Sequence, residues 1–283
     1  METNDIESTG WPTPAFPAGA ASAAFAGFTH HEAAARIAQG LSEPLLGALD
    51  GSQVQLCPQN SSTLGEEECA RLREDFPSVA FRVHANASCG GKFGLHDASS
   101  DWSSRAFQEW KAMLRRACQA LDAPAYSWHA GRSTNASLSQ ALARTKDLEQ
   151  ELGIPVGIEG LYPSAATPWL MSSFEDYRAA MASGAAFAID LSHWQIVAKA
   201  SGRREMGLLR DLLSHPRCVE IHISDNDGVR DNHRKLERQP FWFGLLCELS
   251  AKKLLRADIF SEGLQASNKQ ALAERSGRGP IAL

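Results

Sequence analysis

The sequence has no long apolar run, no closely spaced cysteine pair and no excess of positive charge. None of its apolar runs approaches the roughly 18 residues of a membrane-spanning helix, which excludes a helical membrane span. Its six cysteines form no C-x-x-C pair, so we expect reduced, mostly buried thiols. Lysine and arginine number 28 against 33 aspartates and glutamates, and this acidic balance disfavours long-range attraction of a polyanion such as DNA.

The first residues do not resemble a secretion signal. The first eight hold three acidic side chains and no basic cluster, and three prolines interrupt the alanine-rich stretch that follows. A signal peptide instead begins with basic residues before an unbroken apolar segment. Together with the expected free thiols, this favours a cytoplasmic protein.

Length and composition indicate a globular chain with a large core. Hydrophobic residues make up 43% of the chain and charged residues 22%, close to the averages of globular domains and unlike disordered or fibrous chains. At 283 residues, the chain fits either one α/β barrel of about 250 residues or two smaller domains.

Short apolar runs alternate with longer segments of helical periodicity. Seven of these runs are too short for a helix and have the length of a buried strand. They are 54–56, 79–83, 125–128, 156–158, 187–189, 218–221 and 257–260. The helical segments between them include 107–121, 138–152, 174–182, 206–214 and 243–255. The alternation predicts an α/β fold with a parallel sheet.

The first fifty residues fit this pattern less well. Residues 1–27 are rich in Ala, Gly, Pro and Phe without a clear period, so we expect an irregular N-terminal arm that leaves room for a degenerate first strand. Residues 29–49 predict a helix that Gly51 closes, with His30 and His31 at its solvated start. The barrel domain is therefore expected over residues 28–283.

A histidine, aspartate or glutamate follows six of the predicted strands at regular intervals. These residues are His84, His129, Glu159, Asp190, His222 and Glu262, and the gaps between them are 45, 30, 31, 32 and 40 residues. A βα unit takes about 30 residues, and a barrel of about 250 residues divided among eight strands gives about 31. Because parallel strands end at the same side, this spacing predicts a single (β/α)8 TIM barrel whose mouth gathers these residues.

Together these residues indicate a metal site, although a single strand-end histidine is more often a hydrogen-bonded core residue. Three buried carboxylates in one barrel mouth either take up protons or need cations. Two more pairs extend the set, His193 beside Asp190 and His233 beside Asp231. Nine candidate ligands exceed the capacity of one ion, so two or three ions are implied, with Glu159 or Glu262 as a bridge. Imidazoles and carboxylates without thiolates suit zinc, manganese or iron.

The ordered motifs resemble a known superfamily. They are Val83-His84, Trp128-His129, Gly157-Ile158-Glu159-Gly160, Ile189-Asp190-Leu191-Ser192-His193, Ile221-His222-Ile223-Ser224-Asp225, Asp231-Asn232-His233 and Ser261-Glu262-Gly263. Over roughly residues 52–275, this set resembles the xylose isomerase-like TIM-barrel superfamily, which includes endonuclease IV and many sugar isomerases and epimerases.

The resemblance implies alternative ligand sets. Similarity to endonuclease IV implies one ion on His84, His129 and Glu159, a second on Glu159, Asp190, His222 and Glu262, and a third on His193, Asp231 and His233. Similarity to the sugar isomerases and epimerases implies a single ion on Glu159, Asp190, His222 and Glu262. In that case Glu159 and Glu262 also move a proton on a substrate carbon.

Two segments depart from the superfamily's pattern. After His233, where a Gly-x-Gly turn is common, this chain continues with Arg234-Lys235-Leu236, so the substrate-facing loop differs. After His84, where endonuclease IV places bulky residues that wedge into DNA, this chain has Ala85-Asn86-Ala87-Ser88, which are too small to fill a gap in a base stack. Nucleic acid is therefore a less favoured partner than a small molecule.

Four side chains beside the predicted ligands are candidates for substrate binding. Arg132 and Arg234 supply positive charge for an anionic group. Trp194 and Trp242 adjoin ligand positions and suit the lining of a pocket, although packing in the core is an equally good interpretation.

Three enzymatic functions fit the sequence. The leading one is a metal-dependent isomerase or epimerase of a sugar or sugar phosphate, in which Glu159 and Glu262 exchange a proton at carbon. The first alternative is a trinuclear zinc phosphodiesterase like endonuclease IV. The second is a multinuclear iron enzyme that uses oxygen to modify a peptide or small metabolite. A barrel without chemistry is disfavoured, because idle clustered carboxylates are costly to keep together.

Overall fold

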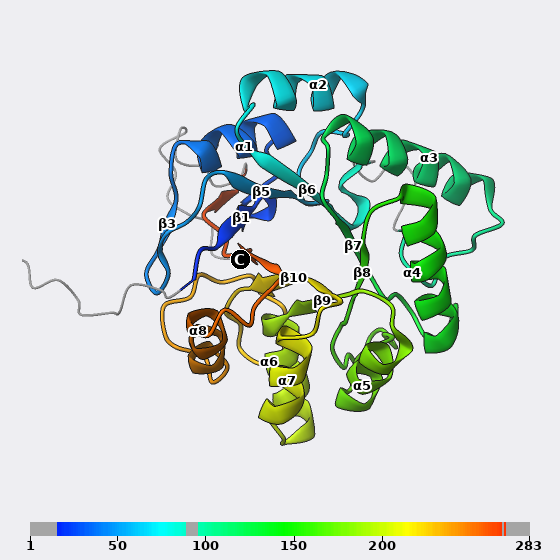
Figure 1. Cartoon of the computed structure of the whole chain (residues 1–283), viewed down its shortest axis with the longest axis vertical. Coiled ribbons are helices and arrows are strands. Elements are labelled where there is room, and N and C mark those ends of the chain that lie inside the picture. The colour runs from blue at the N-terminus through cyan, green and yellow to red at the C-terminus, as the bar shows by residue number, and fades with distance from the viewer. Residues whose placement is uncertain (1–15, 89–95, 268, 270–283) are drawn as a thin grey trace, which may run out of the picture.

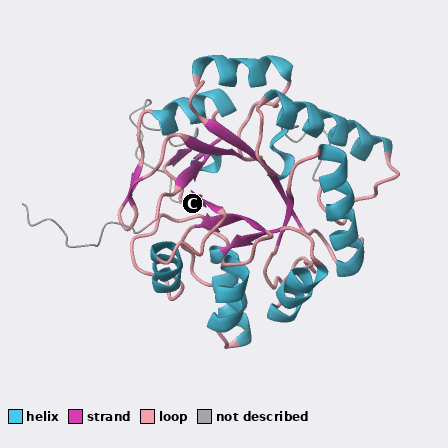
Figure 2. Cartoon of the chain, in the orientation of Figure 1, coloured by secondary structure: helices cyan, strands magenta, loops and turns pink. Residues whose placement is uncertain are grey.

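Eight parallel strands form a closed barrel at the centre of the molecule (Figures 1 and 2). The computed structural model describes residues 16–88, 96–267 and 269. The barrel strands are β1 (Gly19–Ala21), β5 (Gln53–Leu56), β6 (Ala80–His84), β7 (Tyr126–His129), β8 (Val156–Glu159), β9 (Phe187–Asp190), β10 (Cys218–Ile223) and β11 (Asp258–Ser261). They follow one another around the barrel in chain order, and β1 pairs with β11 to close it. The single TIM barrel and all seven predicted strands are confirmed.

Helices surround the barrel on the outside (Figure 2). They are α1 (His30–Ala38), α2 (Glu66–Asp75), α3 (Arg105–Ala120), α4 (Leu138–Leu152), α5 (Phe174–Ser183), α6 (Leu191–Ser201), α7 (Met206–Leu213) and α8 (Phe243–Ala251). The strand sequences are nearly continuous apolar runs because both faces of the sheet are covered. The helices cover the outer face, and the inner face packs in the barrel interior. In α3, for example, Phe107, Trp110 and Leu114 recur every three to four residues and are fully buried, which places one helix face on the sheet.

The strand β1 corrects the predicted boundary of the barrel. It lies within residues 1–27, where the sequence predicted an irregular arm with room for a degenerate first strand, and it pairs with both β11 and β5. Its sequence Gly-Ala-Ala carries no apolar run, so periodicity does not reveal it. A Cβ atom on Gly19 would lie 2.6 Å from the carbonyl oxygen of Gln53, so close pairing here requires glycine. The barrel thus begins at Gly19, and residues 1–15 of the arm lie outside the described residues.

The predicted helix over residues 29–49 is shorter than expected. It ends at Ala38, and Gly40 then adopts a φ of +102°, which a helix does not tolerate. A small antiparallel hairpin follows, formed by β3 (Ser42–Glu43) and β4 (Gly47–Ala48). The leucines that suggested a longer helix, Leu45 and Leu46, pack into the core from this hairpin.

Two helices escaped prediction for different reasons. Only Cys69 and Leu72 of α2 are buried, and its first turn holds three glutamates, so its apolar period is weak. The helix α6 begins directly after β9, without the intervening loop that would mark a boundary. Smaller elements complete the described chain: the 3-10 turns η1 (Ser22–Ala24) and η2 (Ala85–Ser88), and the short parallel pair β2 (Phe25–Ala26) and β12 (Ala266–Ser267).

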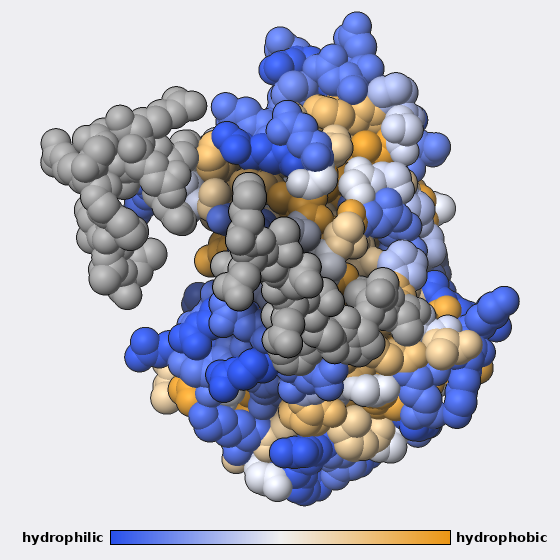
Figure 3. Space-filling model, turned by 90° about the vertical axis from the view of Figure 1, so that its left-hand side faces the viewer, coloured by the Kyte–Doolittle hydropathy of each residue, from blue (hydrophilic) through white to orange (hydrophobic). Residues whose placement is uncertain are grey.

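The outer surface is mixed in character. Figure 3 shows hydrophilic residues over much of one face, with hydrophobic residues between them. Among the described residues, the large hydrophobic side chains that are strongly exposed are Val229, Leu254 and Leu264. Within the same residues, no helix combines the length and the apolar character needed to cross a membrane.

His30 is not the solvated residue that its position at a helix start suggested. Its side chain is 0% exposed, and its Nε2 lies 3.2 Å from the carbonyl oxygen of Ala87. Burial lowers the pKa of His30 to about 4, although Ala87 and Glu68 partly oppose the shift. The ring is therefore neutral in the folded protein and becomes protonated more readily in the unfolded chain.

This predicts a loss of stability in acid. Because the folded pKa of His30 lies below the unfolded value near 6.5, the unfolded state binds more protons, and stability falls as the pH drops from about 6.5 to about 4. Between pH 7 and pH 4.5, the unfolding free energy in urea with EDTA should fall by about 2 kcal/mol more in the wild type than in His30→Gln. His31→Gln, at the adjacent and partly exposed position, is the control. Equal losses in the wild type and His30→Gln would contradict the assignment.

Candidate metal centre

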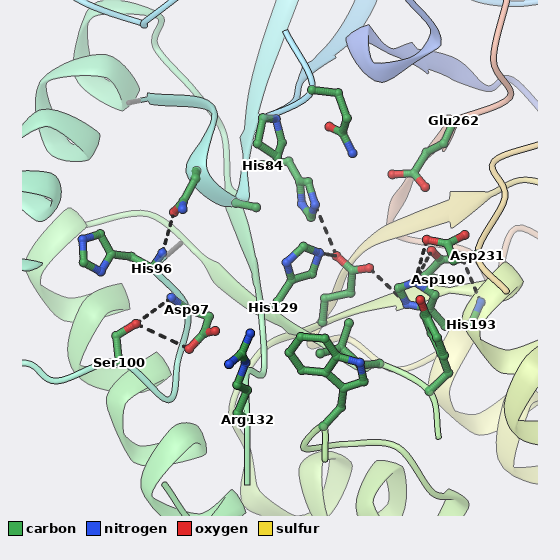
Figure 4. A pocket seen from close by; sticks show the side chains of 18 of the residues that line it. His84, His96, Asp97, Ser100, His129, Arg132, Asp190, His193, Asp231 and Glu262 are labelled. Atoms are coloured by element: carbon green, nitrogen blue, oxygen red, sulfur yellow. Dashed lines mark hydrogen bonds and ion pairs between the residues drawn. The ribbon is translucent and has the colours of Figure 1, made fainter. Parts of the chain in front are cut away.

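The strand-end residues meet at the mouth of the barrel, around a cavity of about 590 Å³. Pairing between neighbouring strands places His129 beside Glu159 and His222 beside Asp190. All nine predicted ligands lie at this mouth, and Figure 4 shows His129 between the Arg132 end of the cavity and the cluster of Asp190, His193 and Asp231. Eight of them line the cavity, while His222 is fully buried behind it.

Three histidine nitrogens surround one oxygen of Glu159. Oε2 of Glu159 lies 3.6 Å from Nε2 of His84, 3.9 Å from Nε2 of His129 and 3.5 Å from Nδ1 of His222. These distances exceed those of good hydrogen bonds, and this buried oxygen accepts none within the described structure. Two ligands of one tetrahedral zinc ion stand roughly 3.3 Å apart, because each bond is about 2.0 Å long. The group His84, His129 and Glu159 therefore fits an ion.

A second group shares Glu159 with the first. Glu159, Asp190 and His222 each offer a ligand atom within 4.8 Å of the others. Nδ1 of His222 also lies 3.6 Å from Oε1 of Glu262, and this buried nitrogen has no hydrogen-bond partner in the described structure. A buried nitrogen that faces two carboxylates and makes no hydrogen bond is suited to be a metal ligand.

Backbone groups orient the side chains of Asp190 and His193. The carboxylate of Asp190 caps helix α6, where Oδ1 accepts hydrogen bonds from the backbone N–H groups of Ser192 and His193. This arrangement leaves Oδ2 free, 3.3 Å from Nε2 of His193. Nδ1 of His193 lies 2.9 Å from the carbonyl oxygen of Gly160, so it carries the proton and leaves Nε2 as the ligand atom.

A third group forms around His193 and differs in one member from the resemblance. Nε2 of His193 lies 3.3 Å from Oδ2 of both Asp190 and Asp231, so Asp190 joins this group. His233 is close by, with Nε2 3.0 Å from Oδ2 of Asp231 and Nδ1 3.2 Å from Oε2 of Glu262. Its φ of +45° is in the left-handed region, a backbone strain that is often retained at functional sites.

The electrostatics of the cluster follow from crowding. Burial raises the pKa of Asp190 to about 6, and Glu262 adds to the rise while His193 opposes it. Burial also acts on Glu159, but His222, His84 and His129 outweigh it and hold the pKa of that carboxyl below its usual range. Imidazoles and the backbone N–H groups at the start of α6 thus offset part of the negative charge of the mouth, and divalent ions would complete the balance.

Glu43 ties two ligand-bearing loops together from outside the cluster. Its buried carboxylate accepts hydrogen bonds from the hydroxyl of Ser261 and from the backbone N–H of Leu236, 3.1 Å away. A Cβ atom on Gly263 would lie 2.6 Å from Oε1 of Glu43, so a larger residue beside Glu262 would displace this carboxylate from its hydrogen bonds. The hairpin β3–β4 thereby holds the backbone that carries His233 and Glu262.

The four predicted substrate-binding residues fall in different places. Arg132 lines the cavity, and its guanidinium lies 5.6 Å from the ring centre of Trp169. Arg234 is exposed and pairs with Asp225 through its backbone, and it does not line the described cavity.

Trp194 and Trp242 require a correction. Both are fully buried in the hydrophobic core and neither lines the described cavity. Trp194 projects from α6 against Phe174, with ring centres 4.6 Å apart, and donates a hydrogen bond to the carbonyl oxygen of Arg204. Adjacency to a ligand in the sequence does not give a side chain the same direction, because successive residues of a helix point about 100° apart.

Several cavity-lining residues were not predicted from the sequence. Tyr162, three residues after Glu159, places its ring 4.8 Å from that of His193, and its closeness to the Glu159 motif is a signal that points to it. His96, Asp97, Ser100, Asn135 and Trp169 also line the cavity, and they lie on loops without a motif.

We expect the purified protein to retain ions. Elemental mass spectrometry of untagged protein, prepared without chelators, should find one to three divalent ions per chain, and EDTA should lower the melting temperature by several degrees, since an ion at 100 times its dissociation constant adds about 2.7 kcal/mol. Asp190→Asn should retain fewer ions, whereas Asp101→Asn, outside the centre, should match the wild type. A chain without metal whose melting temperature ignores added zinc, manganese and iron would contradict the metal centre.

The fold is found in enzymes with different activities. No protein-family model and no curated protein matches the sequence. Among solved structures, a D-tagatose 3-epimerase-like protein is similar, with a TM-score of 0.62, 14% identity, and coverage of 92% of this chain and 95% of that one. An AP endonuclease of family 2 from Brucella melitensis has a TM-score of 0.62 and 12% identity, and the match covers 93% and 99% of the two chains.

A third structure, a D-allulose 3-epimerase from Methylomonas sp. in complex with D-allulose, has a TM-score of 0.54 and 14% identity, over 95% of this chain and 91% of that one. At these identities the similarity concerns the fold, which different reactions share. This chain therefore shares the TIM-barrel fold of these three proteins.

Proposed function

We propose that this protein is a metal-dependent isomerase or epimerase of a small polar substrate, a sugar or sugar phosphate. The observation that carries the proposal is the placement of Glu159 and Glu262 on one cavity. Both carboxylates approach Nδ1 of His222, at 3.5 and 3.6 Å, from β8 and from the end of β11. Two carboxylates on different strands that face one bound substrate are suited to remove and return a proton at carbon. The sugar epimerases of the same fold support this choice.

In the proposed mechanism, Glu159, Asp190, His222 and Glu262 hold a divalent ion. When bound, the ion polarises a carbonyl or hydroxyl oxygen of the substrate. Glu159 then takes a proton from the adjacent carbon, and Glu262 delivers a proton to the neighbouring or opposite position. Nδ1 of His233 lies 3.2 Å from Oε2 of Glu262 without a formed hydrogen bond, and in this mechanism it hands a proton to that carboxylate during turnover.

The opposite end of the cavity is suited to an anionic group. Arg132 lines this end together with Asn135, and no carboxylate within the described residues pairs with its guanidinium. Contact with the Trp169 ring holds the guanidinium over the cavity. A phosphate or carboxylate there would lie beyond His129, at a distance from the acidic cluster (Figure 4).

Loss of either proposed catalytic carboxylate should abolish turnover. With manganese or cobalt and a panel of sugars and sugar phosphates in D2O, NMR should detect isomerisation or deuterium uptake at carbon, and Glu159→Gln or Glu262→Gln should slow it by about 10²- to 10⁴-fold. Because both residues are also proposed ligands, metal content is measured for each variant and excess metal is supplied. Glu67→Gln, on the exposed face of α2, is the control. Unchanged turnover in both glutamine variants would rule out this mechanism.

Arg132 should contribute to substrate affinity rather than to the chemical step. Arg132→Gln should raise KM for a phosphorylated substrate roughly 10- to 100-fold with little change in kcat, since a hydrogen bond to a charged group contributes about 1.5–3 kcal/mol. The unphosphorylated sugar should be affected far less, and Arg105→Gln, on the exposed face of α3, should not change either constant. A fall in kcat with KM unchanged would show that Arg132 acts otherwise.

A phosphodiesterase is the second candidate, and the convergence of nine ligands in three groups favours it. One observation disfavours a DNA substrate for this candidate. Ala85 and Ala87, which follow His84, are small and buried, so η2 presents no side chain at these positions that could enter a base stack. Two or three zinc ions per chain with incision of an abasic-site duplex would support this candidate. One manganese, cobalt or magnesium ion would support the isomerase, and two or three irons with oxygen consumption would support an oxidative enzyme.

A further inference from the structure

Below the metal centre, the barrel interior holds a carboxylate that neither the motifs nor the proposed mechanism uses. Glu220 lies on β10, two residues before His222, so both side chains point into the barrel. Its side chain is 0% exposed and lies below the cavity, so it does not line the described cavity wall. A buried carboxylate in this position needs partners that donate hydrogen bonds.

Four side chains from four strands meet Glu220. Arg82 donates from Nη1 to Oε1 over 3.2 Å, and Gln55 donates from Nε2 to Oε2 over 2.9 Å. The hydroxyl of Ser127 donates to the same Oε2, and Nε2 of His222 lies 3.1 Å from it. Because Arg82 is permanently charged, it keeps Glu220 ionised, and an ionised carboxylate can only accept hydrogen bonds.

One arm of this network reaches His84. The hydroxyl of Ser127 has one proton and donates it in the hydrogen bond to Glu220. Its oxygen therefore accepts a hydrogen bond from Nδ1 of His84, which lies 2.9 Å away. Nδ1 of His84 then carries the ring proton, and Nε2 is left bare. That bare nitrogen is the atom that faces Glu159 in the first ion group.

The other arm reaches His222, whose Nε2 lies between two groups of opposite character. Glu220 can only accept, while the amide nitrogen of Gln55, 2.7 Å away, can only donate. With a proton on Nδ1, Nε2 accepts from Gln55. With an ion on Nδ1, the proton must lie on Nε2, where Glu220 accepts it, and the amide nitrogen of Gln55 must then turn away from the ring.

We propose that Glu220 is a positioning residue that sets the ring orientation and tautomer of His84 and His222, so that Nε2 of one and Nδ1 of the other point at the ions. It acts through Ser127 on the first ring and directly on the second. Carboxylates that orient ligating histidines typically change metal affinity 10- to 100-fold. This inference rests on the proposed metal centre and not on the proposed reaction.

The test measures zinc affinity and stoichiometry by competition with a chromogenic chelator, on the full chain stripped with EDTA. Glu220→Gln should weaken zinc binding about 10- to 100-fold, because an amide cannot accept from all its neighbours. Ser127→Ala should weaken only the ion that His84 binds. Asp258→Asn is the matched control, since Asp258 pairs with Arg82 on the far side and contacts neither histidine.

A second readout separates positioning from general damage. In zinc-loaded protein, ¹⁵N NMR of the histidine rings should show the Nδ1–H tautomer for His84 and the Nε2–H tautomer for His222. Ser127→Ala should change the first signal and leave the second. If Glu220→Gln does not fold, Ser127→Ala decides, because it keeps the carboxylate.

The outcomes are distinct. Zinc affinity within about twofold of wild type in both Glu220→Gln and Ser127→Ala overturns the role of Glu220 while leaving the metal centre in place. Equal weakening in Asp258→Asn also overturns it, since the effect would then come from the loss of ion pairing at Arg82. A wild-type chain that binds no zinc overturns the metal centre and this inference together.

Discussion

The repulsion among three buried carboxylates is the main constraint on the mouth of the barrel. Glu159, Asp190 and Glu262 come from different strands, yet the barrel brings them to one mouth because all its strands point the same way. In a medium that screens charge poorly, such groups are stable only beside positive charge or donors. The histidines between these carboxylates supply part of the positive charge. The N-terminus of α6 supplies hydrogen-bond donors to Asp190. Oε2 of Glu159 and the Nδ1 atoms of His222 and His233, which have no hydrogen-bond partner in the described structure, are the reason to propose ions at the site.

The sequence predicts this convergence well, because the length of a βα unit imposes the spacing of the strand ends. It predicts the direction of side chains poorly. His193 and Trp194 are neighbours on α6, but one faces the cavity and the other is enclosed by Phe174 and Tyr177. Spacing along the chain places a residue near the mouth, and only packing decides which way it points.

Two other features give little signal in the sequence, one because of its composition and the other because of its depth in the barrel. The strand β1 is made of glycine and alanine, whose small side chains allow the close approach that seals the barrel but give no apolar signal. Glu220 lies one layer below the mouth, in a strand where alternation makes a single acidic residue look like a surface position. Its role becomes visible only when the partners from β5, β6 and β7 are brought across the barrel.

The attachment of Glu43 to the loop after His233 has a consequence for how this protein can diversify. The hairpin holds Leu236 through backbone groups, with Glu43 accepting from its N–H and the N–H of Leu45 donating to its carbonyl oxygen. Backbone groups are present whatever residue occupies the position. Substitutions at the exposed neighbours Arg234, Glu237 and Arg238 therefore leave the anchor of His233 and Glu262 intact, so this loop can vary in sequence without displacing the backbone that carries the two proposed ligands.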